Sequence, residues 1–285
     1  MFVLKVGGNE IDDEEFVERL GQVLGSLAKP IVLVHGGGKE IKQLQEQLGL
    51  KPQYIDGLRV TDADSLALVQ MVLAGRVNKR LVATLSNAGL DVFGMSGIDR
   101  ASIQAKKLEH PQGDLGYVGQ VTYVKREVFT RLLEDGVFPI LSPICYGPGG
   151  NVFNVNADHV ALALAVALEA EELVFLTNVP GVLQDGELLS KLTSSETEAL
   201  ITSEVIFGGM IPKVRSALNA VQGGVKTVRI TNLDGLQAGT GTKIRAAAPQ
   251  TAQRSPSAQN EVVNEIVNLK SKIQNPESTH LEESL

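Results

Sequence analysis

The sequence has too few cysteines and histidines for a disulfide framework or a structural metal site. Cys145 is its single cysteine, and its four histidines are scattered along the chain. One cysteine cannot form an internal disulfide, and the spacing of these residues is not that of zinc ligands. We therefore predict a protein of a reducing compartment, with no metal-binding residues.

The sequence also lacks a targeting segment and a membrane span. It begins MFVLKVGG, without the basic start, apolar core and small-residue cleavage site of a signal peptide. No apolar run is long enough to cross a bilayer. We predict a cytoplasmic protein with no membrane partner.

Clusters of Lys and Arg are missing as well. The net charge is −7 and the isoelectric point is near 5.2, whereas a surface that neutralises nucleic-acid phosphates needs clustered cations. This excludes a nucleic-acid partner. Small anionic ligands stay possible, because they need only a few local cations and backbone N–H groups.

What the sequence does contain is an alternation of short apolar runs with helical patterns. With 285 residues, 43% of them hydrophobic, the chain can bury a large core and is long enough for two lobes. Such alternation is typical of α/β proteins with a mostly parallel sheet, which bind ligands at the carboxyl ends of their strands. Residues 92–124 instead predict shorter strands and hairpins. The expected strands are 2–6, 31–35, 138–144, 172–179 and 226–231, and the expected helices are 12–27, 39–48, 157–170 and 213–222.

Regular structure is expected to end near residue 244. Residues 245–259 are rich in Ala, Pro, Ser and Gln, which predicts a linker. Beyond it, Val262, Ile266, Leu269 and Ile273 recur at a spacing that lines one face of a helix. Two interpretations are open: a loosely attached amphipathic helix, or a helix that docks or self-associates.

Two glycine-rich segments follow expected strands. In KVGG (residues 5–8) a lysine stands beside two glycines, and in HGGGK (35–39) three glycines open directly into a helix. Exposed N–H groups and the positive end of the helix dipole favour an anion there. The second segment is neither a Walker A loop, because no Ser or Thr follows Lys39, nor a G-x-G-x-x-G fingerprint, because position 41 is Ile. Taken alone, each segment is also compatible with an ordinary turn.

Three further segments carry polar residues next to expected helices. Arg59 could grip a carboxylate through two parallel N–H···O bonds, although a solvated arginine is an equal alternative. Asn154, Asn156 and Asp158 lead into a strongly apolar helix, and helix capping explains only one of them. Lys213 lies in the first turn of a helix, where a cation opposes the helix dipole unless an anion binds there.

These segments, in this order, resemble the amino-acid kinase family. The resemblance spans about residues 3–244. It implies a three-layer α/β/α sandwich around a mostly parallel open sheet, with an acyl-amino-acid-binding lobe (1–170), a nucleotide-binding lobe (171–244) and a linker with an amphipathic tail (245–285). The motifs that carry it are KVGG (5–8), VHGGG (34–38), GLRVT (57–61), NVNAD (154–158) and GGMIPKV (208–214), with GRVNKR (75–80), LTNVPGV (176–182) and GTKI (241–244) between or after them.

The same resemblance implies a role for each candidate site residue. Lys5 and Lys213 would be catalytic and stabilise the transferring phosphoryl group from opposite sides, and Asp158 would orient both lysines. Asn178 departs from the pattern of many relatives, which carry an acidic residue there. The substrate-binding residues would be Gly37, Gly38, Arg59, Asn154 and Asn156, and the nucleotide-binding residues would be Gly7, Gly8, Thr177, Asn178, Val179, Gly181, Gly209 and Met210.

The implied activity is ATP-dependent phosphorylation of the side-chain carboxylate of N-acetyl-L-glutamate, in arginine biosynthesis, with Mg²⁺ carried on the nucleotide. A carboxylate is already ionised near neutral pH, so this reaction needs no general base. Two alternatives stay open: a kinase for carrier-protein-linked or acetylated 2-aminoadipate in lysine biosynthesis, and a non-catalytic amino-acid-sensing module. Asn178 and residues 95–107 leave the first open, whereas GLRVT (57–61) argues for acetylglutamate. Lys5, Asp158 and Lys213 together argue against the second.

The start of the chain bears on assembly. Only Met1 precedes the first expected strand. Arginine-inhibited members of the family are similar to one another in carrying an extra N-terminal helix that links dimers into a ring. We therefore expect a homodimer that arginine does not inhibit, with the C-terminal segment as the alternative route to a larger assembly.

Overall fold

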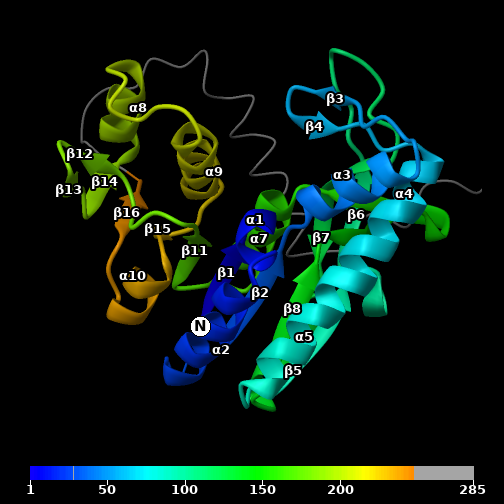
Figure 1. Cartoon of the computed structure of the whole chain (residues 1–285), viewed down its shortest axis with the longest axis horizontal. Coiled ribbons are helices and arrows are strands. Elements are labelled where there is room, and N and C mark those ends of the chain that lie inside the picture. Colours follow the sequence, from blue (N-terminus) through cyan, green and yellow to red (C-terminus); the bar gives the residue numbers. More distant parts are fainter. Residues whose placement is uncertain (28, 247–285) are drawn as a thin grey trace, which may run out of the picture.

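The computed structural model describes residues 1–27 and 29–246 (Figure 1). Residues 247–285, which hold most of the predicted linker and all of the predicted amphipathic helix, lie outside the described residues. Among the described residues, no helix combines the length and the apolar character needed to cross a bilayer.

An eight-stranded sheet forms the centre of the fold, with β1 (Phe2–Val6) lying between β2 (Ile31–His35) and β11 (Glu172–Leu176). The strand order is β14-β16-β15-β11-β1-β2-β8-β5. Every neighbouring pair is parallel except β15 with β16, so the prediction of a mostly parallel sheet is confirmed. The other strands are β5 (Val92–Ser96), β8 (Phe138–Ser142), β14 (Lys191–Thr193), β15 (Val228–Thr231) and β16 (Thr242–Arg245).

Helices cover both faces of this sheet. Successive strand residues point to opposite faces, so Leu4 belongs to one buried apolar cluster and Val3 to the other. The cluster around Leu4 packs against α2 (Glu14–Ser26), α10 (Leu233–Ala238) and a continuous helical stretch made of α4 (Ala63–Gln70), a π-helical segment (Met71–Val77) and α5 (Asn78–Asn87). The cluster around Val3 packs against α6 (Arg126–Glu134), α7 (Ala157–Ala167) and α9 (Met210–Gln222).

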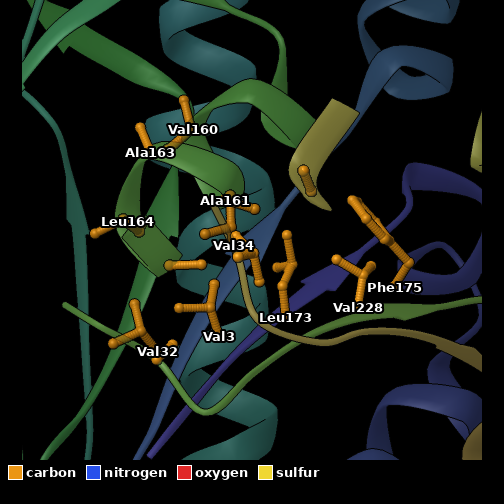
Figure 2. Packing of buried hydrophobic residues seen from close by; sticks show 14 of the residues in the cluster. Val3, Val32, Val34, Val160, Ala161, Ala163, Leu164, Leu173, Phe175 and Val228 are labelled. Atoms are coloured by element: carbon orange, nitrogen blue, oxygen red, sulfur yellow. The ribbon is translucent and has the colours of Figure 1, made fainter. Parts of the chain in front are cut away.

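Figure 2 shows the second cluster from close by. Ala161 of α7 lies beside Val34 of β2, with Val3 of β1 close by, and all three are buried. Five residues of α7 are buried in this way, which explains why the helix is hydrophobic nearly all round. The predicted α/β/α sandwich is therefore confirmed.

Two parts of the fold differ from the sequence-based expectation. The expected strand 138–144 is divided at Pro143 into β8 and β9 (Ile144–Tyr146), because proline has no N–H to continue a ladder. Residues 92–124 do contain the antiparallel pair β6 (Ile103–Lys107) and β7 (Val118–Val124), but β5 joins the main sheet. The strands β6, β7 and β9 close into a small barrel with β10 (Val152–Val155).

Helix boundaries shift for local reasons. The carboxylate of Asp13 accepts a hydrogen bond from the Phe16 nitrogen at 3.2 Å, so α2 begins at Glu14 and the short α1 (Gly8–Ile11) precedes it. Glu169 has a positive φ of 52°, and α7 ends just before it, at Ala167. The remaining elements are α3 (Gly38–Gln47), the hairpins β3 (Tyr54–Ile55)/β4 (Leu58–Arg59) and β12 (Leu183–Gln184)/β13 (Glu187–Leu188), α8 (Ser194–Thr202), and two 3₁₀ turns (Asp99–Ala101 and Pro148–Gly150).

Candidate active site

The site is built where β1, β2 and β11 end at the same edge of the sheet. Val6, the last residue of β1, pairs with His35 of β2 and Leu176 of β11. Three loops therefore leave the sheet together, and they carry the KVGG, HGGG and LTNV segments of the sequence. This is the edge at which parallel sheets bind their ligands.

The two glycine-rich loops touch through their backbones. A Cβ atom added at Gly8 would lie 3.0 Å from the Gly37 nitrogen, and one added at Gly36 would lie 3.2 Å from the Gly8 nitrogen. Side chains at these positions would push the loops apart. Glycine is therefore required for close backbone approach, which leaves N–H groups of both loops available for an anion.

A cavity of about 840 Å³ opens beside these loops. It is formed by α1, by the start of α3, by the segment after β11 and by the start of α9. Most of the residues predicted to bind the nucleotide lie here together with both predicted catalytic lysines. The lining residues are Lys5, Gly7, Gly8, Asn9, Glu10, Asp13, Phe16, Gly38, Lys39, Asn178, Val179, Gly209, Met210 and Lys213.

Lys5 forms an ion pair with Asp158, with 2.8 Å between Nζ and Oδ1. The other carboxylate oxygen accepts a hydrogen bond from the Ser216 hydroxyl at 2.7 Å. Burial alone would raise the pKa of Asp158, but the Lys5 ammonium and the Ser216 hydrogen bond outweigh it and lower that pKa. Asp158 is thus a fixed negative charge that holds the Lys5 ammonium at the floor of the cavity.

Lys213 reaches the cavity from α9. Its ammonium donates hydrogen bonds to the Thr177 hydroxyl and, at 3.4 Å, to the Asn178 side-chain oxygen. Burial lowers the pKa of Lys213. Asp158 contacts Lys5 directly, and it contacts the helix of Lys213 through the Ser216 hydroxyl. Its orientation of Lys213 stays a prediction.

A smaller cavity, of about 230 Å³, lies on the other side of the glycine loop. It shares Gly38 with the larger one, so the two cavities meet at the start of α3. All five residues predicted to bind the substrate line it. The lining residues are Gly36, Gly37, Gly38, Ile41, Tyr54, Gly57, Leu58, Arg59, Leu73, Val118, Pro143, Asn154, Val155, Asn156 and Ala157.

Arg59 is held in place from several sides. Its guanidinium donates to the side-chain oxygen of Gln45 and to the Gly38 carbonyl at 3.1 Å, and lies 4.9 Å from the centre of the Tyr54 ring. Gln45 is buried and donates in turn to the Ser65 hydroxyl at 3.3 Å. A guanidinium has five N–H donors, so these contacts leave donors for a carboxylate in the smaller cavity.

The three polar residues around the start of α7, Asn154, Asn156 and Asp158, have different partners. The Asn156 side chain caps the helix by accepting from the Asp158 nitrogen at 2.8 Å, and Asp158 pairs with Lys5. Asn154 donates from its side-chain nitrogen to the Thr61 hydroxyl at 3.2 Å and lines the smaller cavity. This matches the expectation that capping accounts for only one of the three.

Two predicted nucleotide contacts lie outside the cavity lining. Thr177 is buried and meets the cavity only through Lys213. Gly181 has a φ of +149°, and a Cβ atom there would lie 2.5 Å from the Thr242 hydroxyl oxygen. Its glycine is explained by this tight turn against β16, and its contact with a nucleotide stays a prediction.

Sequence reasoning missed several lining residues. Lys39 lies in the first turn of α3 and lines the larger cavity. Lys213 was predicted from the same pattern, a lysine in the first turn of a helix, so the sequence did indicate Lys39 as well. Glu10, Asp13 and Phe16 follow the KVGG segment without a recognisable pattern. Leu73 enters the smaller cavity from the π-helical segment and packs tightly on Gly37, where a Cβ atom would lie 2.6 Å from its Cδ2. An apolar helical pattern does not reveal a π-helical turn, which often marks a functional position.

Known proteins are similar to this chain over most of its length. Residues 1–232 match the model of the amino acid kinase family. An acetylglutamate kinase of Roseiflexus sp. (strain RS-1) is 54% identical over 234 residues, which cover 82% of this chain and 89% of the relative. One of Methanopyrus kandleri is 43% identical over 253 residues, covering 86% and 100%. The crystal structure of smu.665 from Streptococcus mutans UA159 superposes with a TM-score of 0.71 at 37% identity, covering 86% of this chain and 98% of that one.

Proposed function

The chain belongs to the amino acid kinase family, and we propose that its activity is that of an acetylglutamate kinase. It transfers the γ-phosphoryl group of ATP to the side-chain carboxylate of N-acetyl-L-glutamate, a step of arginine biosynthesis. One observation carries the proposal: a large cavity with two lysines meets a small cavity with an anchored arginine at a shared glycine loop. Two anionic ligands bound there would face each other across the glycines.

The chain's own residues provide what the reaction needs. A carboxylate oxygen of the substrate forms a bond to the γ-phosphorus, while the bond from that phosphorus to the β,γ-bridging oxygen breaks and ADP leaves. No proton has to be removed, because the carboxylate is already ionised. Lys5, Lys213 and the N–H groups of Gly8 and Gly38 neutralise the negative charge that spreads over the transferring group.

Mg²⁺ enters with the nucleotide in this proposal. A hard cation prefers oxygen ligands, and Glu10 and Asp13, which line the larger cavity, would be the protein residues to hold it. When bound, the ion supplies further positive charge at the phosphates. The residues present therefore fit a nucleotide-borne metal.

The smaller cavity supports a small acyl amino acid as the substrate. Arg59 offers N–H donors for the α-carboxylate, and Leu58, Leu73 and Val118 add apolar walls suited to a short acyl group. A volume of about 230 Å³ suits a free metabolite better than an aminoadipate attached to a carrier protein. A sensing module would not need the paired Lys5 and Asp158, so the catalytic reading is preferred.

Assembly and location belong to the same proposal. β5 is an edge strand of the main sheet, and Phe93 on it is 50% exposed. An exposed apolar edge is suited to pairing with a second copy, which supports a homodimer. A cytoplasmic location supplies the ATP that the reaction consumes.

Coupled measurement of ADP release tests the proposal. We expect ADP release that depends on N-acetyl-L-glutamate, with a much lower kcat/KM for glutamate, aspartate and acetylated 2-aminoadipate. Lys213→Met should abolish most of this activity, whereas Lys191→Met, which changes an exposed lysine of β14 outside both cavities, should leave it unchanged. Equal or higher kcat/KM for the aminoadipate substrate would contradict the proposed substrate.

A further inference from the structure

We propose that Thr61 is a positioning residue that sets the orientation of Asn154 for the acyl amino acid substrate. The inference rests on the proposed function and concerns the same small cavity. Thr61 is completely buried, with 0% of its surface exposed, so it cannot touch a ligand itself. Its hydroxyl instead links two residues that line the cavity.

The Thr61 hydroxyl can donate to only one of its two partners and must accept from the other. Its oxygen lies 3.0 Å from the carbonyl oxygen of Arg59 and 3.2 Å from the side-chain nitrogen of Asn154. A carbonyl oxygen can only accept, so the single hydroxyl proton must point to Arg59. The Thr61 oxygen is then left with lone pairs, and only the NH₂ end of the Asn154 amide can face it.

This fixes what Asn154 presents to a ligand. An Asn amide that turns by 180° exchanges its donor for its acceptor. With its NH₂ end on Thr61, Asn154 keeps a second N–H and its oxygen in set directions. Without the Thr61 hydroxyl, the amide could turn and place an oxygen lone pair against a substrate carboxylate, which would repel it.

Backbone hydrogen bonds fix the position of the Thr61 hydroxyl relative to Asn154. The Thr61 nitrogen donates to the Leu115 carbonyl at 3.0 Å, and its carbonyl accepts from the Tyr117 nitrogen at 2.7 Å. The Tyr117 carbonyl in turn accepts from the Asn154 nitrogen at 2.9 Å. Gly116 has a φ of +67°, and a Cβ atom there would lie 2.3 Å from the Thr61 carbonyl oxygen, so position 116 admits no side chain. Thr61 and Asn154 are therefore tied to the same loop by backbone bonds as well.

Thr61→Val tests the proposal, because valine keeps the shape and removes the hydroxyl. We expect the KM for N-acetyl-L-glutamate to rise roughly tenfold, the size of one lost or reversed hydrogen bond, and the KM for ATP to stay within about twofold. Thr61→Ser, which keeps the hydroxyl, should restore a KM near that of the wild type. The matched control is Thr197→Val in α8, which removes a buried hydroxyl that donates to the Thr193 carbonyl at 2.7 Å. It should lower the Tm without changing either KM.

A double-mutant cycle identifies the route of the effect. If Thr61 acts through Asn154, the KM penalty of Thr61→Val should largely disappear in an Asn154→Ala background. A wild-type KM in Thr61→Val overturns the proposal. So does a double variant whose increase in KM equals the product of the increases in the two single variants. Should Thr61→Val fail to fold, Thr61→Ala removes the same hydroxyl and gives the same readout. A wild-type enzyme that releases no ADP with N-acetyl-L-glutamate would overturn the proposed function. An active wild-type enzyme with an unchanged KM in Thr61→Val would overturn the role of Thr61 alone.

Discussion

Replacing Lys5 by methionine removes the ammonium from the cavity floor while keeping an unbranched side chain of similar length. Two consequences follow from the ion pair at 2.8 Å with Asp158. The transferring phosphoryl group loses a cation, and Asp158, whose side chain is only 21% exposed, loses its counter-ion. The first effect concerns turnover and the second concerns the free energy of unfolding.

The magnitudes can be set separately. Loss of one pre-positioned donor to a transition-state charge lowers kcat by about 100- to 1,000-fold, with a small change in the KM for N-acetyl-L-glutamate. Removing one partner of a largely buried ion pair costs about 3 kcal/mol of stability at pH 7. The double variant Lys5→Met/Asp158→Asn should regain most of that stability, because a neutral amide can still accept from Ser216, but none of the turnover.

The pH dependence of stability changes sign in the single variant. In the wild type the pKa of Asp158 lies below its ordinary value of 3.8, so its contribution is complete above pH 3.8 and is lost as the pH falls through the lowered pKa. Without Lys5, burial raises the pKa of Asp158 above 3.8. Its stabilising contribution is then complete below pH 3.8 and is lost as the pH rises through the raised pKa. The stability gap between wild type and variant should therefore widen from pH 4 to pH 7.

Urea unfolding followed by circular dichroism measures this gap, because the chain contains no tryptophan for fluorescence. Turnover is measured in the same buffers by ADP release. A kcat within about threefold of the wild-type value would refute the role of Lys5 in phosphoryl transfer. A gap that stays constant with pH would refute the account of Asp158 as its buried counter-ion.

Three further predictions concern single residues of the site. Arg59→Lys should raise the KM for N-acetyl-L-glutamate about tenfold and leave the KM for ATP unchanged, since a point charge cannot form two parallel N–H···O bonds; the opposite pattern in steady-state kinetics would move Arg59 to the nucleotide side. Gly8→Ala should lower kcat at least tenfold, because its Cβ would lie 3.0 Å from the Gly37 nitrogen and displace the phosphate-binding loop; normal kinetics would show that the loops can separate freely. Burial lowers the pKa of His35 from 6.5 to about 4, so the wild type should lose about 3 kcal/mol of stability as the pH falls from 6.5 to 4. Urea unfolding of His35→Gln over the same pH range should show a smaller loss of stability. An equal loss in the variant would contradict this role of His35.

The sequence predicted the fold well where local pattern and long-range structure agree. The mainly apolar runs 2–6 and 31–35 are the strands β1 and β2 with those limits, because parallel strands covered on both faces are built mostly of apolar residues. Lys5 and His35 are the exceptions, at or next to the ends where the site is built. Pro143 was a readable signal that the predicted strand 138–144 had to break. The position of β5 in the main sheet was not readable, because strand order depends on long-range pairing that periodicity does not encode.

The site was predictable to the extent that its chemistry leaves motifs. Glycines and lysines at the ends of strands and starts of helices indicated the larger cavity, and Arg59 with Asn154 indicated the smaller one. The role of Thr61 was not visible, because a threonine in a loop gives no sign that its hydroxyl will be buried between two other residues. Leu73 was missed because its place in the cavity depends on the π-helical turn.

The central claim is that a side-chain carboxylate receives the phosphoryl group. Hydroxylamine traps an acyl phosphate as a hydroxamate, so trapping in the presence of N-acetyl-L-glutamate and MgATP tests the claim directly. The account predicts one acetylglutamyl hydroxamate for each ADP released, with both products lost together in Lys213→Met. ADP release without hydroxamate would show that water or another group receives the phosphoryl group, and would contradict the account.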